Sequence, residues 1–241
     1  MTIKKIPVLF ASAYSMLWGG SLLIPGPVHA RQAEPAKATK TIADFTKSMV
    51  KHEGFLPLYW EEKTGKLWME ISHWDQELLY VTSLPTGLGS NEIGLDRGQL
   101  GDGRIVRFQR VGPTVFLVEP NYAFRADSKN ADERRAVEEA FAQSILASFP
   151  VEVEEGGRVL IEVTGFANRD AHGITKALAD ARQNGYSLDA KRSTIAVART
   201  RAFPRNTEIE SILTFAGGSG AAVSAVAPTP QADPVSCERL R

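Results

Sequence analysis

The chain has 241 residues, of which 43% are apolar and 23% are charged, as in an ordinary globular protein. Its 28 lysines and arginines equal its 28 aspartates and glutamates, which excludes a global field that would steer it to nucleic acid or to an anionic membrane surface. The one cysteine, Cys237, excludes an intrachain disulfide and a structural zinc site made of thiolates. We therefore expect no nucleic-acid partner and a fold held by core packing.

The N-terminus predicts an export signal. A basic start, an apolar run from Ile6 to Ile24 and the small residues Val28-His29-Ala30 are typical of a cleaved signal peptide. We expect residues 1–30 to be this signal and residues 31–40 to be a polar linker, so that the protein is exported to the periplasm or the extracellular space. The alternative is a permanent membrane anchor, but serines and glycines dilute the run, and we expect no stable anchor after cleavage.

Residues 41–83 predict a small N-terminal module that combines a helix with hairpin strands. Thr41 is a suitable N-cap for a short helix, and Gly54 ends that helix. Aromatic and alternating apolar residues then predict strands, and a polar connection containing glycine joins the first two as a hairpin. The predicted strands span residues 55–60, 67–72 and 77–83.

A glycine-rich loop, residues 82–103, follows the last of these strands. Its six glycines give the backbone access to positive φ, whereas a flexible linker would rarely keep large apolar groups as well. We expect an ordered loop anchored by its large apolar side chains, which are Leu88, Ile93, Leu95 and Leu100. The candidate contact residues are polar side chains of this loop and of the strand after it, namely Asn91, Asp96, Arg97 and Arg107.

The sequence does not support a dinucleotide-binding site or an EF-hand calcium site in this loop, and it favours a structural role. Gly87-Leu88-Gly89 lacks the third glycine of a dinucleotide-binding fingerprint, because a glutamate stands at the required position. Asp96 and Asp102 do not have the spacing of an EF-hand calcium loop, so we expect these aspartates to bond their own backbone. We favour a structural use, in which Asp96 and Arg97 form an ion-pair network with Arg107 that fixes the loop to the sheet.

The chain contains no complete catalytic motif. His52-Glu53 begins like an HExxH zinc helix, but Leu56 stands where the second histidine is required and Gly54 interrupts the helix. His73 and His172 are isolated in the sequence, and no G-x-S-x-G nucleophile elbow is present. We therefore assign no catalytic residue, no metal ligand and no cofactor to this chain, and the sequence leaves enzymatic activity uncertain.

Residues 84–216 predict a β-rich domain with two helices; we divide it from the first module near residue 84, with a core shared by both modules as the alternative. Residues 130–148 predict the longer helix and residues 171–183 the second, with antiparallel hairpins around them. The longer helix has an apolar stripe that we expect to be buried, formed by Val137, Phe141 and Ile145. Residues 217–241 are rich in glycine and proline and predict a flexible tail. The expected fold class is α+β, with mainly antiparallel strands and two covering helices.

Three segments carry a family resemblance: TGLGSNEIGLDRGQLG at 86–101, RIVRFQRVGPTVFLVEPNYAFRA at 104–126 and RSTIAVARTRAFPRNTEIESILTF at 192–215. They resemble the N-terminal region of exported bacterial zinc-dependent metalloproteases. In that family the region consists of domains of unknown function, and the HExxH zinc site lies in a later domain. No residue of this chain matches that site. The resemblance therefore implies a non-catalytic chain, with zinc only in a downstream domain.

The resemblance implies one function, and the residues leave an alternative open. As the N-terminal region of a metalloprotease-like protein, truncated before the zinc-binding domain, the chain is expected to support or shield a protease domain encoded downstream or separately. The alternative is a stand-alone exported module that binds a protein or a glycan with the glycine-rich loop and exposed aromatic side chains. The aromatic candidates are Trp60, Trp68 and Trp74.

Overall fold

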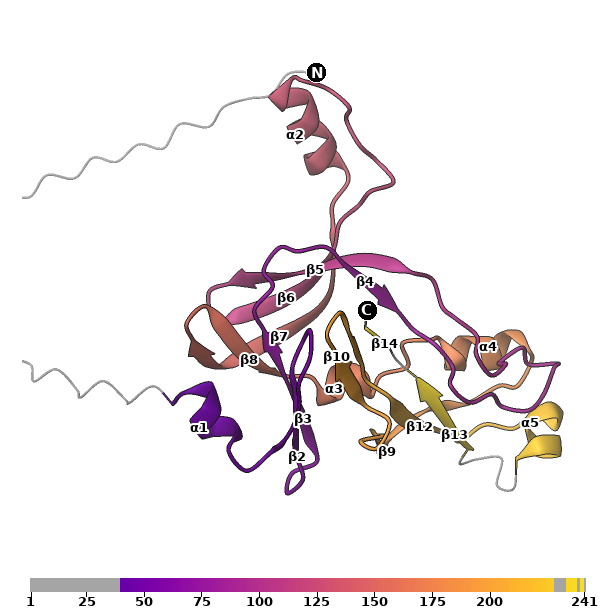
Figure 1. Cartoon of the computed structure of the whole chain (residues 1–241). Helices are drawn as coiled ribbons and strands as arrows, with labels where there is room; N and C mark the ends of the chain where they lie inside the picture. Colours follow the sequence, from indigo (N-terminus) through magenta and orange to yellow (C-terminus); the bar gives the residue numbers. More distant parts are fainter. Residues whose placement is uncertain (1–39, 228–232, 238, 241) are drawn as a thin grey trace, which may run out of the picture. The chain divides into compact units, whose positions relative to one another are not determined.

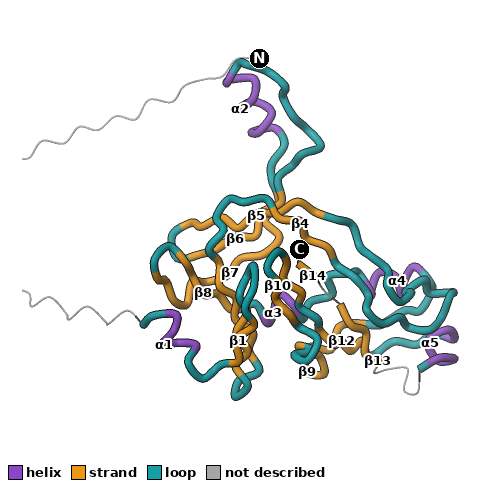
Figure 2. Tube along the Cα trace, viewed as in Figure 1, coloured by secondary structure: helices purple, strands orange, loops and turns teal. Residues whose placement is uncertain are grey.

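The computed structural model describes residues 40–227, 233–237 and 239–240. The predicted signal peptide and all but the last residue of the predicted linker lie outside these residues. Antiparallel strands dominate the described part of the chain, and five short helices accompany them (Figure 1). Figure 2 shows the same preponderance of strands over helices along the trace. These features confirm the expected α+β class.

Eleven antiparallel strands form one sheet. In chain order they are β1 (Val50–His52), β2 (Leu58–Glu61), β3 (Lys66–Ile71), β4 (Leu78–Val81), β5 (Arg104–Val111), β6 (Thr114–Glu119), β7 (Ser144–Glu155), β8 (Arg158–Glu162), β10 (Arg201–Phe203), β11 (Asn206–Glu208) and β14 (Arg239–Leu240). Their order across the sheet is β1-β2-β3-β8-β7-β6-β5-β4-β14-β11-β10. Strands from both predicted modules therefore share one sheet, because β3 pairs with β8 and β4 pairs with β5.

A second sheet and the helices complete the described structure. This sheet contains β9 (Ser187–Ile195), β12 (Ser211–Ala216) and β13 (Asp233–Cys237), with β12 in the middle. The helices are α1 (Ile42–Thr46), α2 (Ala131–Ala140), α3 (Thr164–Ala167), α4 (Ile174–Asp180) and α5 (Ala221–Val226). Helix α4 confirms the helix expected within residues 171–183, and it buries Ile174 and Leu178.

Short turns set the register of the hairpins, as the sequence predicts. Between β7 and β8, Gly156 and Gly157 both have positive φ, at 56° and 80°, and the pair Glu155 and Arg158 closes the hairpin. Glycine adopts this backbone region without steric cost, which allows a two-residue connection. The predicted hairpins β2–β3 and β5–β6 are confirmed in the same way.

Buried apolar side chains form three clusters. The first lies on the large sheet and joins residues such as Leu58 and Ile71 to Val115, Phe149 and others of both predicted modules. The second joins the glycine-rich loop to α4, α5 and the second sheet. The third lies under α1, where Ile42 packs with Tyr59, Trp68, Val153 and Leu160. The glycine-rich loop contributes side chains to the second cluster, whereas residues 120–143, which connect β6 to β7, contribute none to any of the three.

The prediction of a buried helix over residues 130–148 is wrong in two respects. Helix α2 ends at Ala140, and none of its residues is buried. Ile145 is not helical, because it lies in β7 opposite Val118 of β6. A β-branched residue fits this pleated, half-covered position, and the ladder bonds to β6 replace the helical bonds that the spacing predicted. The expected apolar stripe is consequently divided between a helix, its C-cap and a strand.

The prediction of a flexible tail over residues 217–241 also needs correction where the structure describes the chain, and residues 228–232, 238 and 241 lie outside the described residues. Residues 221–226 form α5, whose Ala222 and Val223 are buried in the second cluster. The backbone of β13 pairs with β12 from Ser211 opposite Cys237 to Phe215 opposite Asp233. Small apolar side chains and an open strand edge are enough to order these segments, although their glycine and proline content is typical of linkers.

Candidate functional site

The glycine-rich loop lies between β4 and β5 and is anchored in the second cluster. Leu84, Ile93 and Leu95 are buried there with α4 and α5, and Leu88 packs against them. Backbone bonds from Gly98 to Leu84 and from Leu88 to Leu95 fold the loop back on itself. The expectation of an ordered, apolar-anchored loop is therefore confirmed. It is wrong for one residue, because Leu100 is 66% exposed.

The structure separates the predicted contact residues. Asn91, Asp96 and Arg97 are all exposed on the loop. Arg107 lies on β5, where its Nη2 donates to the amide oxygen of Gln143 at 3.0 Å. Among the described residues no ion pair joins Asp96 or Arg97 to Arg107, so the expected network is wrong. The reason is long-range packing, since the loop packs toward α4 and α5 while Arg107 contacts the chain between β6 and β7.

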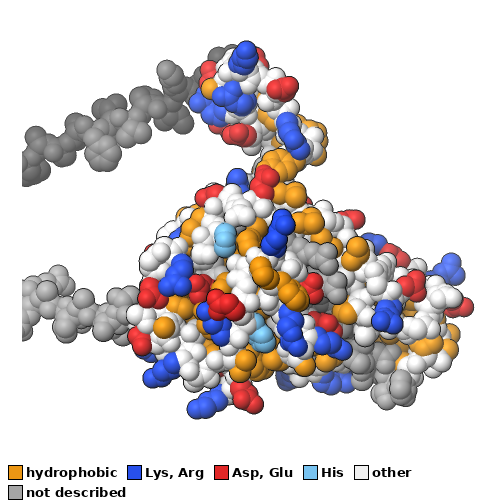
Figure 3. All heavy atoms as spheres, in the orientation of Figure 1, with side chains coloured by type: hydrophobic (Ala, Val, Ile, Leu, Met, Phe, Trp, Pro, Cys, Tyr) orange, Lys and Arg blue, Asp and Glu red, His pale blue; other side chains and the backbone are white. Residues whose placement is uncertain are grey.

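Arg107 lines a hollow formed with residues 120–143, the connection from β6 to β7. We call it the α2 hollow, and it has a volume of about 630 Å³. Three aromatic rings border it, and Tyr122, Phe124 and Phe141 remain 40%, 50% and 39% exposed. The rings of Phe124 and Phe141 stack at 3.9 Å between centroids with an angle of 7°. Figure 3 shows basic, acidic and hydrophobic side chains together on the part of the surface that carries α2.

Three arginines reach the α2 hollow, and each donates to a neutral acceptor. Arg107 bonds Gln143, Arg125 Nε bonds the Tyr122 carbonyl at 3.0 Å, and Arg134 Nη1 bonds the Ser128 carbonyl at 2.7 Å. None of the three forms an ion pair with a carboxylate of the described residues. The Nε of Arg107 is buried and has no acceptor in that part of the chain. The hollow thus combines uncovered rings with cations that lack a carboxylate partner.

Tyr122 connects the hollow to the start of β4. Its hydroxyl donates a hydrogen bond to Glu77, and this bond raises the pKa of Tyr122 above its ordinary value. The guanidinium of Arg125 lies 4.8 Å from the centre of the Tyr122 ring, a cation–π distance. These contacts fix the position of the ring, which nevertheless remains 40% exposed.

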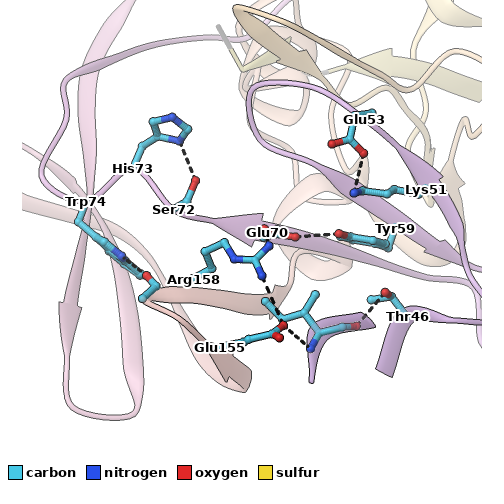
Figure 4. Close-up of polar contacts among 12 residues, drawn as sticks. Thr46, Lys51, Glu53, Tyr59, Glu70, Ser72, His73, Trp74, Glu155 and Arg158 are labelled. Atoms are coloured by element: carbon cyan, nitrogen blue, oxygen red, sulfur yellow. Dashed lines mark hydrogen bonds and ion pairs between the residues drawn. The ribbon is translucent and has the colours of Figure 1, made fainter. Parts of the chain in front are cut away.

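A buried carboxylate, Glu70 on β3, lies under α1 (Figure 4). Its oxygens accept hydrogen bonds from the Tyr59 hydroxyl at 2.7 Å and from Arg158 Nη1 at 2.8 Å. Burial raises the pKa of Tyr59, and the bond to Glu70 raises it further. Glu155 accepts from the backbone N–H of Ile42 at 3.1 Å, which attaches α1 to the sheet. Because each oxygen of Glu70 has a donor, this cluster is structural.

Sequence reasoning missed the burial of Glu70. Alternation along β3 places Trp68 and Glu70 on the face opposite Leu67 and Met69, and a polar residue there indicates an exposed face. The large indole of Trp68 on that same face was the available signal that something covers it.

A second hollow, of about 540 Å³, lies where the loop meets the segment before α4. Thr82 Oγ1 and His172 Nδ1 are 3.2 Å apart, and burial lowers the pKa of His172. Asp170 accepts the backbone N–H groups of Ile174 and Thr175 at 2.7 and 2.8 Å. Its carboxylate therefore caps α4, and Thr82 and His172 bond each other within the hollow.

The tryptophans do not form the exposed platform that a glycan-binding surface requires. Trp68 is buried, and Trp60 and Trp74 are partly buried against the first cluster. The indole N–H of Trp74 donates to the Gly157 carbonyl at 2.7 Å, and that of Trp68 donates to Glu61 at 3.2 Å. The prediction that these rings are exposed is wrong because the strands turn them toward the core clusters.

The described residues contain no group of three His, Cys, Asp or Glu side chains arranged to hold a metal ion. No helix among them has both the length and the apolar character to cross a membrane.

Comparison with protein families gives two matches. Residues 39–87 match a domain of unknown function (DUF5118), and residues 98–237 match a domain of unknown function (DUF5117). The first matched segment contains α1 and strands β1 to β4, and the second contains the elements from β5 to β13. No curated protein and no solved structure matches the chain.

Proposed function

Because the chain belongs to the DUF5117 family, we propose its function from the surface that it presents. The chain is the non-catalytic N-terminal region of an exported zinc-metalloprotease-like protein, and it docks against the protease domain to support or shield it. Zinc belongs to that protease domain, since no HExxH segment occurs in this chain.

The observation that carries the docking role is the α2 hollow. Contiguous exposed apolar groups beside cations are typical of interaction sites rather than of inert surface. Aromatic residues and arginine are also the types enriched at protein interfaces. Full burial of a phenylalanine is worth about 1.5–3 kcal/mol relative to full exposure, so a partner that covers the half-exposed Phe124 gains part of this.

The proposed identity of the partner rests on the resemblance to exported metalloproteases. The resembling segment at residues 104–126 includes Arg107, Tyr122, Phe124 and Arg125 of the α2 hollow. One of the three segments that look like the protease family therefore contributes part of the uncovered surface. This coincidence supports docking to the protease domain over docking to an unrelated protein.

The alternative function is a stand-alone exported module that binds another protein. The same hollow supports it, because an exposed aromatic surface does not by itself specify a partner. The glycan version of this alternative has weaker support, since the tryptophans on which it depends are buried or partly buried.

A capture experiment tests the proposal. The exported chain is immobilised, and a separately expressed HExxH metalloprotease domain of the resembling family is passed over it. We expect capture by the wild type and loss of capture in the double variant Phe124→Ala and Phe141→Ala. The matched control is Phe203→Ala, because Phe203 is similarly exposed but lies on β10, outside the hollow.

Two outcomes contradict the proposal. The first is failure of the wild type to retain the protease domain, or equal retention by the double variant. The second is stoichiometric zinc together with peptidase activity in the purified chain alone. Reading the DNA downstream for a frame that encodes an HExxH segment identifies the protease domain to use.

A further inference from the structure

We propose that the α2 hollow recognises an acidic peptide segment that also carries an aromatic or aliphatic side chain. Arg107, Arg125 and Arg134 bind its carboxylates, and the rings of Phe124 and Phe141 pack against its apolar group. This deepens the proposed function, on which it rests only for the identity of the protein that offers the segment.

The charge of the hollow favours an anionic occupant. Its lining contains three arginines but one acidic residue, Glu138. In the chain as a whole the lysines and arginines equal the acids, so this excess is local. A local excess of cations that bond only neutral oxygens selects ligands by charge complementarity.

The arginines have unused donors for such a ligand. Each guanidinium carries five N–H groups, of which one in Arg125 and one in Arg134 bonds a backbone carbonyl. Guanidinium and carboxylate match as a bidentate pair of charge-assisted bonds. Elsewhere this fold makes that pair internally, since Arg110 bonds both oxygens of Glu154, at 2.6 and 2.7 Å. In the hollow none of the three arginines forms an ion pair with a carboxylate of the described residues, Glu138 included, so their charge is available to a ligand.

The apolar walls favour a peptide over a nucleic acid or a free anion. Phe124, Phe141 and the partly buried Val137 line the same hollow as the arginines. An extended peptide places side chains two positions apart on the same face, so an acidic and an apolar side chain at such positions reach the hollow together. The volume of about 630 Å³ has room for several side chains.

Binding of a defined probe tests this inference. The probe is a fluorescein-labelled octapeptide of two Glu-Glu-Phe-Phe repeats, which places a glutamate and a phenylalanine two positions apart on one face, and its matched control has glutamine in place of each glutamate. We expect the exported chain to bind the glutamate peptide in fluorescence anisotropy and to bind the glutamine peptide at least about tenfold more weakly. Raising the salt concentration should weaken the first interaction, because exposed ion pairs are screened.

Two substitutions locate the site. Arg125→Gln and Arg134→Gln should each weaken binding by about tenfold, since each removes charge-assisted bonds. Arg97→Gln is the matched control, because it removes the same charge from an exposed arginine of the glycine-rich loop, outside the hollow. Unchanged near-ultraviolet circular dichroism shows that each variant is folded, as we expect for exposed side chains.

Several results overturn the inference. These are no binding of the glutamate peptide, equal binding of the glutamine peptide, or equal loss in the Arg97 control. Tighter binding of an eight-residue oligothymidylate would assign the hollow to nucleic acid instead. A dimer in sedimentation that dissociates on Phe141→Ala would show that a second copy of the chain covers the hollow.

The outcomes also separate this inference from the proposed function. If the protease domain is captured equally by the wild type and both arginine variants, the docking role stands and the acidic segment does not. If the glutamate peptide binds through the arginines but the protease domain is not captured, recognition of an acidic segment stands and the metalloprotease partner does not.

Discussion

The glycine-rich loop and the chain from residue 120 to 143 both connect neighbouring strands of the large sheet, and both contain large apolar side chains. Ile93 and Leu95 of the loop are buried against α4 and α5. Phe124 and Phe141 of the second connection stack on each other and stay exposed. The difference shows that apolar content alone does not bury a connection, because burial also requires an element that packs over it.

The largest expected effect comes from truncating one side chain in each connection. Leu95→Ala should lower the free energy of unfolding by about 2–5 kcal/mol, because it leaves a cavity in a packed cluster. Phe141→Ala should lower it by about 1 kcal/mol or less, since it removes mainly one stacking contact. Urea denaturation of both variants measures the difference. Equal losses would mean that the second connection is packed as tightly as the first.

A tyrosine bonds a glutamate in a buried setting at Tyr59 and in an exposed setting at Tyr122. Tyr59→Phe should cost about 1.5–3 kcal/mol, because the buried carboxylate of Glu70 loses a donor. Tyr122→Phe removes the bond to exposed Glu77 and should leave the urea midpoint unchanged. The isosteric substitution keeps both rings, so the hydroxyl alone is tested.

The pH dependence of stability gives a second measure of the Tyr59 contact. Burial raises the pKa of Tyr59 in the folded protein, so the folded state holds this proton more tightly than the unfolded chain does. The stability from this group is therefore complete below the ordinary tyrosine pKa of about 10 and is lost as the pH rises above it. Wild-type stability should fall more steeply than that of Tyr59→Phe above that pH, and parallel curves would contradict the assignment.

Close packing of Gly87 against the backbone of the same loop predicts a smaller loss of stability on substitution. A Cβ added at Gly87 would lie 2.7 Å from the backbone nitrogen of Arg97, closer than atoms pack. Gly87→Ala should therefore cost about 1–3 kcal/mol through overpacking. Gly165→Ala is the matched control, because a Cβ at that position meets no atom within 4 Å. Thermal unfolding compares the two variants, and a loss confined to Gly165→Ala would contradict the packing of the loop.

The smallest effect is expected from Arg97→Ala. This arginine forms no ion pair with the described residues, so its loss should change stability by less than about 0.5 kcal/mol. Limited proteolysis should cut both the wild type and the variant first between residues 120 and 143 rather than in the glycine-rich loop. New cuts between Gly87 and Gly103 in the variant would restore a structural role for Arg97.

Local sequence signals predicted the parts of the fold that depend on neighbouring residues. Turn glycines such as Gly156 and Gly157 located the hairpins, and helical spacing located α4. The same spacing at Val137 and Phe141 predicted a buried stripe, because periodicity shows which side chains share a face but not what covers that face. Ile145 was misplaced for the same reason, since its partner Val118 is distant in sequence.

The candidate site was predicted less completely than the fold. Arg107 was singled out from the sequence, but with Asp96 and Arg97 as its neighbours. Its contact with Gln143 depends on the pairing of β5, β6 and β7, which brings together residues 36 positions apart. Arg125 and Arg134 had no sequence signal beyond their charge, because exposed arginines are common and their lack of a carboxylate partner is visible only in three dimensions.

The pairing of β3 with β8 has a consequence for how the chain folds. Trp68 lies opposite Glu162, so the strands near the N-terminal end of the described chain find their neighbours only when residues well past its midpoint are available. Bringing such distant segments together costs loop-closure entropy before any ladder bond forms, and topologies of this kind fold slowly. We therefore expect the β2–β3 hairpin to form early and the pairing of β3 with the β7–β8 hairpin to form later. This late pairing should set the rate of refolding.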